Sequence, residues 1–268
     1  MNKPSGDLVK FFEAKREEIE ALTANPPAGR LPGPVPSVRP DFLASLKNGR
    51  QTRGLGLIAE YKRASPSLGD IDLTLEPLGA ARAYRAADAI SVLTEEKYFK
   101  GHLSYLEIMA EAEIPLLRKD FIFHPLQIVQ TSITMASAVL LIVRLTPEAG
   151  LLQELISLAS SFGLRAVVEI FEPDELKLAR QAGAEIIQVN RRDLKTLKID
   201  PDRSAEIIKK YPPLDNEFWI AASGLSKPEE LVRVRDLGFG AVLVGTALMK
   251  SGQPQEALRK LTQDMAVH

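Results

Sequence analysis

Short apolar segments rich in β-branched residues recur along the chain at intervals of about 20 to 35 residues. Several of them lack any polar alternation, which is typical of strands buried on both faces of a parallel sheet. The segments that predict strands are 57–61, 89–93, 114–117, 138–143, 166–170, 185–189, 218–221 and 241–244. Stretches with helical spacing of apolar residues separate them. Eight strands alternating with helices predict an α/β fold, a (β/α)8 TIM barrel.

Two of the intervening stretches carry clear signals for a helix start. The segment 147–161 follows Thr146, which we expect to be its N-cap, and has a proline at its first position. The segment 226–237 begins with Ser226 as its expected cap and is followed by Gly238. An open doubly wound sheet is the rival architecture, but the chain has no GxGxxG sequence.

The first 50 residues do not belong to this repeat. Amphipathic spacing predicts a helix over 8–22 and a second short helix over 39–46, with a Pro/Gly-rich connector between them. We expect the N-terminal helical extension, 1–50, to form one domain with the barrel, 51–268. The extension is either a helix packed over one end of the barrel or a lid over the active site.

Composition narrows the function. The chain of 268 residues has no Cys, which excludes a disulfide framework, a thiol nucleophile and a zinc–thiolate site. Its net charge of −1 and scattered Lys and Arg residues give no field for nucleic acid. The apolar runs are too short for a membrane helix, and the N-terminus lacks the apolar stretch of a secretory signal. His102, His124 and His268 show no metal-ligand spacing. We therefore expect a cytoplasmic protein that acts on a small molecule, while Trp219 is expected in the core.

Polar residues gather where the predicted strands end. In a TIM barrel the reacting groups project from these carboxyl ends. The residues at these ends are Glu60, Lys62, Lys119, Glu169, Asn190, Arg192, Ser223, Gly224, Gly245 and Thr246. A charged side chain among apolar strand residues is costly to bury without a partner, so we expect opposite charges to meet at the barrel mouth. The small residues after the last two strands suit a phosphate site, because backbone N–H groups must approach the anion closely. A salt-bridge network without chemistry is the alternative interpretation.

These residues lie in motifs that resemble the indole-3-glycerol-phosphate synthase family. The motifs are IAEYKRASPSLGDI, SVLTEEKYFKG, PLLRKDFI, VVEIF, QVNRRDLKTLKID, SGLSKPEEL and AVLVGTALMK, in the family's order over 55–250. The resemblance implies a carboxy-lyase of tryptophan biosynthesis that needs no metal or organic cofactor. Its reaction closes 1-(2-carboxyphenylamino)-1-deoxyribulose 5-phosphate to indole-3-glycerol phosphate, CO2 and water.

The resemblance also implies roles for individual residues. Lys119 is the expected general acid, Glu169 and Glu60 are the carboxylates that take a proton, and Lys62 meets the carboxylate of the substrate. It also implies that Asn190 is one of the catalytic residues. The implied substrate contacts are Ser65, Phe99, Phe121 and Arg192, and the implied phosphate contacts are Ser223, Gly224, Gly245 and Thr246. We expect a phosphorylated small-molecule substrate, no nucleic-acid or membrane partner, and a monomer or weak dimer.

Besides Lys100 and His102 in the loop after the second strand, the sequence departs from the family's pattern at two positions. Ala222 stands where the family has Glu in E-S-G, and Ala138 stands where it has Asp in G-A-D. These changes leave open a paralogous phosphate-binding barrel with weak or no synthase activity. The lysine at the end of a strand, Lys119, leaves open a Schiff-base aldolase. Phosphoribosylanthranilate isomerase relies on a Cys in its first strand, which this chain lacks.

Overall fold

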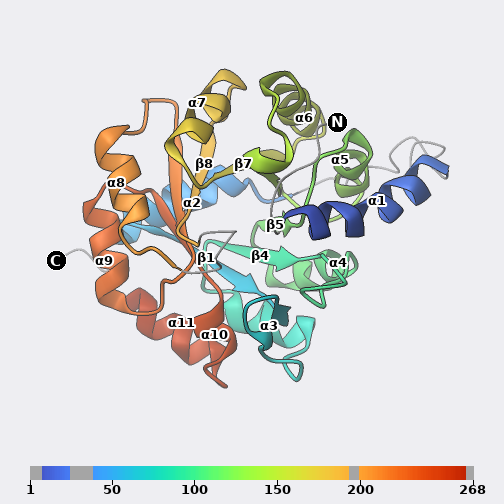
Figure 1. Ribbon diagram of the computed structural model, residues 1–268. Coiled ribbons are helices and arrows are strands. Elements are labelled where there is room, and N and C mark those ends of the chain that lie inside the picture. The colour runs from blue at the N-terminus through green and yellow to red at the C-terminus, as the bar shows by residue number, and fades with distance from the viewer. Residues whose placement is uncertain (1–7, 25–38, 193–198, 264–268) are drawn as a thin grey trace.

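The computed structural model describes residues 8–24, 39–192 and 199–263, and it shows a closed barrel of eight parallel strands (Figure 1). The strands are β1 (Gly56–Tyr61), β4 (Ala89–Leu93), β5 (Leu116–Lys119), β6 (Ala138–Ile142), β7 (Arg165–Ile170), β8 (Ile186–Asn190), β9 (Phe218–Ala222) and β10 (Ala241–Val244). Neighbours in sequence pair in parallel, and β10 pairs with β1 to close the barrel. The predicted (β/α)8 barrel is confirmed.

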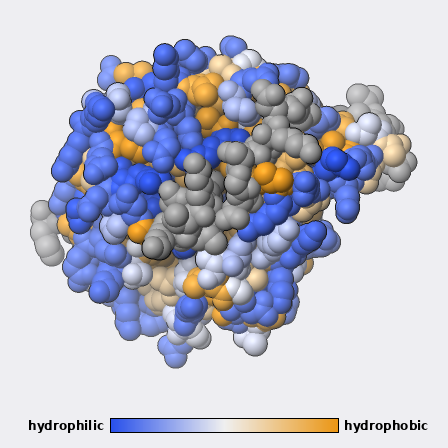
Figure 2. Space-filling model, viewed as in Figure 1, coloured by the Kyte–Doolittle hydropathy of each residue, from blue (hydrophilic) through white to orange (hydrophobic). Residues whose placement is uncertain are grey.

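Helices surround the strands. They are α3 (Pro77–Tyr84), α4 (Tyr105–Met109), α5 (Pro125–Ser132), α6 (Ala149–Ser161), α7 (Pro173–Gln181), α8 (Arg203–Lys210), α9 (Pro228–Asp236), α10 (Thr246–Met249) and α11 (Pro254–Gln263). Short 3-10 turns follow α4 and β6 (η2, Ala110–Ala112; η3, Val143–Leu145), and a small antiparallel pair follows β1 (β2, Ala64–Ser65; β3, Gly69–Asp70). The face in Figure 2 is mostly hydrophilic, as expected of helices whose outer sides meet water. No described helix is both long and apolar enough to span a membrane.

Seven predicted strands agree with the structure to within one residue at either end, and the third does not. We predicted 114–117, whereas β5 is Leu116–Lys119. Pro115 has no N–H to donate to a ladder, so the strand begins after it. The charged Arg118 is accommodated because its guanidinium points out of the barrel and donates to Thr131 Oγ1 at 2.9 Å. The shift places Lys119 at the very end of the strand.

The predicted N-cap of α6 is wrong. The helix begins at Ala149 with Glu148 before it, two residues later than predicted. Thr146 instead ends the 3-10 turn η3, and its hydroxyl donates to the carbonyl of Ile142 at 3.2 Å. A hydroxyl can serve either the next helix or the preceding turn, and the turn holds this one.

The predicted N-cap of α9 is also displaced. Lys227 is the cap residue, and the Glu230 carboxylate accepts its backbone N–H at 3.0 Å. Ser226 lies one residue earlier and donates its own N–H to the same carboxylate at 2.8 Å. Gly238 follows the helix end with φ of 98°, as the sequence indicated.

Two apolar clusters hold the fold together. One lies between the strands and the outer helices and includes the buried Trp219, which confirms that prediction. The other fills the barrel interior. Its strand members include Ile58, Ala89, Leu117, Ala138, Leu140, Val167, Ile186, Ile220, Ala222 and Leu243. Alternate residues of each strand thus face inward, and the inward-facing charged residues Glu60, Lys119 and Glu169 lie near the carboxyl ends of their strands.

The two helices of the extension lie at opposite ends of the barrel. The helix α2 (Phe42–Arg53) closes the amino end, where Leu46 packs against the start of β1. The helix α1 (Leu8–Ala24) runs alongside α5 at the carboxyl end (Figure 1). Both earlier alternatives place a helix over one end, and α1 takes the end that carries the polar residues. Most of the connector lies outside the described residues, as do His268 and part of the QVNRRDLKTLKID motif.

The prediction for α1 is close, whereas that for α2 is wrong at both ends. We predicted 39–46, but the helix begins after Asp41, whose carboxylate accepts from the N–H of Ala44 at 2.8 Å. It continues to Arg53 and ends at Gly54, which has φ of 80°. A side-chain cap and a glycine stop therefore set the bounds of this helix.

Candidate active site

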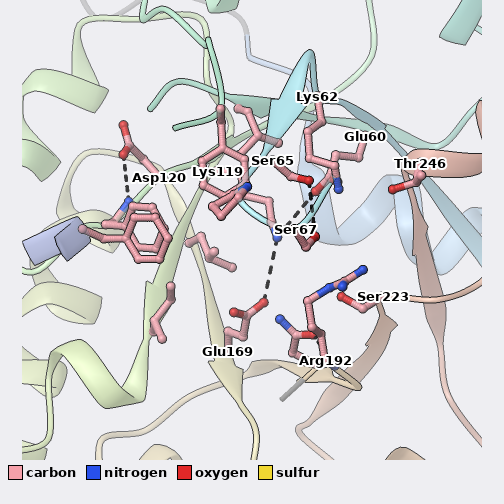
Figure 3. A pocket seen from close by; sticks show the side chains of 18 residues that line it. Glu60, Lys62, Ser65, Ser67, Lys119, Asp120, Glu169, Arg192, Ser223 and Thr246 are labelled. Carbon is pink, nitrogen blue, oxygen red and sulfur yellow. Dashed lines mark hydrogen bonds and ion pairs between the residues drawn. The ribbon is translucent and has the colours of Figure 1, made fainter. Parts of the chain in front are cut away.

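A pocket opens at the carboxyl end of the barrel (Figure 3). Eleven of the predicted residues line it: Glu60, Lys62, Ser65, Phe99, Lys119, Phe121, Glu169, Asn190, Arg192, Ser223 and Thr246. An adjoining hollow shares six of them and adds Gly224 and Gly245. The structure therefore brings all the predicted site residues to one mouth, although they come from seven strands and their loops.

Four of these residues form what we call the inner network: Glu60, Lys62, Lys119 and Glu169. Lys119 Nζ lies 3.5 Å from Glu60 Oε2 and 4.0 Å from Glu169 Oε2 (Figure 3). Lys62 Nζ donates to the other oxygen of Glu60 at 2.6 Å. Both carboxylate side chains are 3% exposed, whereas the lysines are 16–17% exposed. The lysines are thus the groups that a molecule entering the pocket meets.

The charges of the inner network stabilise one another. Burial alone would lower the pKa of Lys119, but the nearby Glu60 and Glu169 outweigh it and raise that pKa above its ordinary value. Burial likewise opposes ionisation of Glu60, but Lys62 and Lys119 hold its pKa below the ordinary value. Lys119 is therefore an ammonium at neutral pH, the state that a general acid needs. Imine formation needs a neutral amine, so this environment disfavours the Schiff-base alternative.

Asn190 and Arg192 stand at the end of β8. The Asn190 side chain accepts from the backbone N–H of Arg192 at 2.9 Å, which fixes the turn as the chain leaves the strand. Both side chains line the pocket. Burial lowers the pKa of Arg192, and the negative charge of Glu60 acts against that effect. This side of the pocket therefore offers one more cation near the inner network.

An aromatic wall bounds the opposite side of the pocket. Phe121 and Phe99 lie with ring centroids 6.0 Å apart, as the predicted apolar surface requires. The sequence analysis missed a third ring. Phe11 of α1 stacks on Phe121 with centroids 4.1 Å apart and planes 8° apart, and it lines the same pocket. The apolar face of the 8–22 helix was visible in the sequence, but nothing there indicated its partner.

The small residues after β9 and β10 serve two different needs. Ser223 and Gly224 both have positive φ, of 73° and 70°, so the chain turns sharply beside the pocket. Gly245 has a different reason to be small. A Cβ on Gly245 would collide with the Glu60 side chain. The glycine thus makes room for a member of the inner network, in addition to any approach of an anion.

Ser65 lies in the short β2 strand. Its hydroxyl is 3.4 Å from that of Ser67, and both residues line the pocket with Pro66 between them. The β2–β3 pair was not predicted, because two-residue strands carry no periodic signal. The S-P-S sequence could have indicated Ser67 as well as Ser65.

A second group of charges, which we call the outer network, was also missed. It consists of Lys15 and Glu18 from α1 with Arg118 and Asp120 from the end of β5. Lys15 donates to Asp120 at 2.9 Å and to Glu18 at 2.5 Å, and Thr94 donates to Asp120 at 2.5 Å. Burial opposes ionisation of Asp120, but Lys15 and Arg118 hold its pKa below the ordinary value. Three consecutive charges in PLLRKDF were the available signal.

The two departures from the family's pattern occupy different depths of the barrel. Ala138 begins β6 at the amino end and is fully buried, two residues before the first β6 residue of the pocket, Leu140. Ala222 ends β9 and pairs with Asn190 and Leu243, at the level of the pocket. Of the two, only Ala222 is placed to affect chemistry.

Comparisons with known proteins agree on the family. The profile described as "Indole-3-glycerol phosphate synthase" matches residues 8–261. A protein of that name from Chloroherpeton thalassium is 42% identical over 255 residues, covering 91% of this chain and 95% of its own. One from Aquifex aeolicus is 44% identical over 211 residues, covering 78% and 81%.

Solved structures share the fold at low identity. A 3-hexulose-6-phosphate synthase crystal structure is 15% identical with a TM-score of 0.63, covering 79% of this chain and 100% of its own. This likeness shows the barrel architecture alone. The family match and the two relatives show more: the chain belongs to the indole-3-glycerol phosphate synthase family.

Proposed function

We propose that the barrel mouth closes 1-(2-carboxyphenylamino)-1-deoxyribulose 5-phosphate to indole-3-glycerol phosphate with loss of CO2 and water. The observation that carries the proposal is the ammonium of Lys119, held between Glu60 and Glu169 and facing an open pocket. Ring closure creates negative charge on a ketone oxygen, and a positioned cation stabilises that charge in the transition state.

Lys119 is the proposed general acid. The aromatic carbon that bears the carboxylate attacks the ketone carbon, and the ketone oxygen takes a proton from Lys119. CO2 then leaves as its bonding electrons restore the aromatic ring. A second protonation lets the new hydroxyl leave as water. The raised pKa of Lys119 keeps it protonated before each turnover.

Glu169 is the proposed base that takes the last carbon-bound proton as the indole forms. Glu60 is a poorer candidate, because each of its carboxylate oxygens already contacts a lysine. Only Oε2 of Glu169 has a partner among the described residues, so its Oε1 is left to accept a proton. Lys62, the second exposed cation, is the proposed partner of the substrate's carboxylate.

The rest of the pocket is proposed to bind the two ends of the substrate. The apolar surface that the rings of Phe99 and Phe121 form suits an aromatic group of the substrate. The turn at Ser223 and Gly224 lies across the mouth, in the hollow that also holds Lys62, Arg192 and Thr246. This hollow is the proposed phosphate site, with Ser65 and Asn190 as further substrate contacts.

The test is an assay for indole-3-glycerol phosphate by its indole fluorescence, with the purified chain and the carboxyphenylamino substrate. We expect product without added metal or cofactor, and retention of CO2 in the substrate would contradict the proposal. Borohydride with a triose phosphate serves as the control for the aldolase alternative, and a trapped covalent adduct on Lys119 would support that alternative instead.

A second candidate rests on Ala222. A paralogue that binds phosphate ligands without catalysis would bind the substrate, give no product and gain nothing from Ala222→Glu. The same assay separates it from the synthase. We also propose that the chain works in the cytoplasm as a monomer or weak dimer. We further propose that it does not bind nucleic acid, which its net charge of −1 supports. Light scattering during gel filtration tests the oligomeric state.

A further inference from the structure

One amide inside the barrel has no place in the mechanism above. Gln188 lies in the middle of β8, is fully buried, and sits between Ile186 and Asn190, both of which face the barrel interior or its pocket. Alternation along the strand therefore turns Gln188 inward as well. A polar side chain in an otherwise apolar interior is unfavourable unless it is hydrogen-bonded.

Gln188 contacts the proposed base. The two residues are direct neighbours in the register of β7 and β8, and Gln188 Nε2 donates to Glu169 Oε2. The same oxygen faces Lys119 at 4.0 Å. Gln188 thus anchors one carboxylate oxygen of Glu169 from the adjacent strand and leaves the other toward the pocket. It does not line the pocket itself.

We propose that Gln188 is a positioning residue that binds the Glu169 carboxylate and holds it correctly oriented while Lys119 gives up its proton. This inference rests on the proposed function. Lys119 is the only cation within 4.0 Å of Glu169 in the described part of the chain. When Lys119 protonates the ketone oxygen, that positive charge is lost. An amide does not titrate, so Gln188 still stabilises the carboxylate at the step that needs a base.

The carbonyl oxygen of the Gln188 side chain, Oε1, supports a role toward Glu169 rather than one in stability. Gln188 Oε1 is buried and has no hydrogen-bond partner among the described residues. Leaving a buried acceptor unpaired is destabilising, so an apolar residue of the same size would serve stability better. Ser91 of β4 has the same defect, because its Oγ is buried without a partner in the described part of the chain. Within that part Ser91 therefore forms no side-chain hydrogen bond to a charged residue, and it provides a matched control.

The experiment measures kcat and KM against pH for Gln188→Met, Gln188→Asn and Ser91→Ala. Methionine keeps the length without a donor, and asparagine keeps the amide but is too short to reach Glu169. Both variants lose a hydrogen bond to a charged group, so the acid limb of the kcat profile moves up by about one to two pH units. The plateau kcat falls about tenfold because the carboxylate is less well held. KM changes little, and Ser91→Ala keeps the wild-type profile.

Each other outcome has a defined meaning. A wild-type profile in both Gln188 variants overturns the inference. A lower kcat with an unmoved acid limb and a lower melting temperature shows a merely structural role and also overturns it. Glu169→Gln is measured alongside: if that variant keeps its kcat, the proposed base is wrong and the proposed function fails at this residue. If Glu169→Gln is inactive while both Gln188 variants keep the wild-type profile, only the inference about Gln188 fails. Should one Gln188 variant not fold, the other still decides.

Discussion

The inner and outer networks meet on adjacent residues of β5 and contain the same charges, yet they differ in how those charges are satisfied. Each has two cations and two carboxylates. In the outer network Lys15 lies 2.9 Å from Asp120, whose side chain is fully buried. In the inner network Lys119 lies 3.5 and 4.0 Å from its two carboxylates and is 17% exposed.

This difference separates a structural role from a chemical one. Neutral groups complete the outer network, because Thr94 and the N–H of Phe121 also bind Asp120. The inner lysines keep donors that face the pocket. Buried charges that are fully paired mainly hold elements together, whereas loosely paired ones retain capacity for a ligand. Activity and stability measurements can therefore tell the two networks apart.

The largest effect is expected from Lys119→Ala. Removing the proposed general acid should lower kcat by about 10²–10⁴, the usual contribution of a positioned acid, while substrate binding weakens less. The free energy of unfolding should fall by less than in the outer network, because Lys119 is 17% exposed and lies 3.5 and 4.0 Å from its two carboxylates. Steady-state kinetics and a denaturant titration measure both quantities. A kcat near that of the wild type would remove Lys119 from the mechanism.

The outer network should respond in the opposite manner. Asp120→Asn leaves Lys15 and Arg118 without their shared carboxylate and lowers the free energy of unfolding by about 3 kcal/mol. The folded pKa of Asp120 lies below its unfolded value, so its contribution is present above about pH 4 and is lost as the pH falls further. The difference between wild type and variant should therefore shrink in acid.

A matched control for Asp120→Asn is available on α1. Glu20 forms an exposed pair with Arg16, so Glu20→Gln should change the free energy of unfolding by about 0.5 kcal/mol or less. If Asp120→Asn is as mild as this control, the outer network is not what holds α1 and β5 together.

Gly245→Ala tests the inner network without removing a charge. The new Cβ collides with Glu60 and pushes its carboxylate away from Lys62 and Lys119. Displacements of about 1 Å cost up to about 10² in rate, so we expect kcat to fall by that order. Gly240→Ala, whose Cβ would meet the Phe218 ring away from the pocket, should affect stability instead. A rise in KM alone would favour an anion at Gly245 over this interpretation.

Phe11→Ala tests whether α1, the helix that the outer network anchors, contributes to substrate binding. The stack of Phe11 on Phe121 helps form the aromatic wall. Loss of one aromatic contact is worth about 0.5–1.5 kcal/mol, so KM should rise up to about tenfold with kcat nearly unchanged. Phe12→Ala removes the neighbouring stack on Phe123, which does not line the pocket, and is the control. Equal KM values for both variants would exclude α1 from substrate binding.

The fold and the inward-facing charges could be predicted from the sequence, because both follow from local patterns. Alternating strands and helices predict the barrel, and the barrel brings the carboxyl ends of the strands together. Contacts that depend on how the barrel closes could not be predicted from the sequence. Phe11 meets Phe121 across 110 residues, and Gln188 meets Glu169 only through the β7–β8 register. Local signals were also ambiguous at Thr146, where a turn and a helix compete for one hydroxyl.

Ala222→Glu is expected to have a small effect on activity, and it tests whether the inner network is complete. The network already balances two cations with two carboxylates, so the wild type should make indole-3-glycerol phosphate without a further anion. A glutamate at Ala222, which is buried at the end of β9 beside Asn190, would add negative charge near Lys119. This charge would raise the pKa of Lys119 further and move the basic limb of the kcat profile to higher pH. We expect kcat at neutral pH to change less than about tenfold, a difference of about 1.4 kcal/mol in activation free energy. The kcat profiles of both proteins on the same substrate decide the matter. An inactive wild type rescued strongly by glutamate would show that charge balance alone does not complete the site, and that a carboxylate at this position handles protons or orders the substrate.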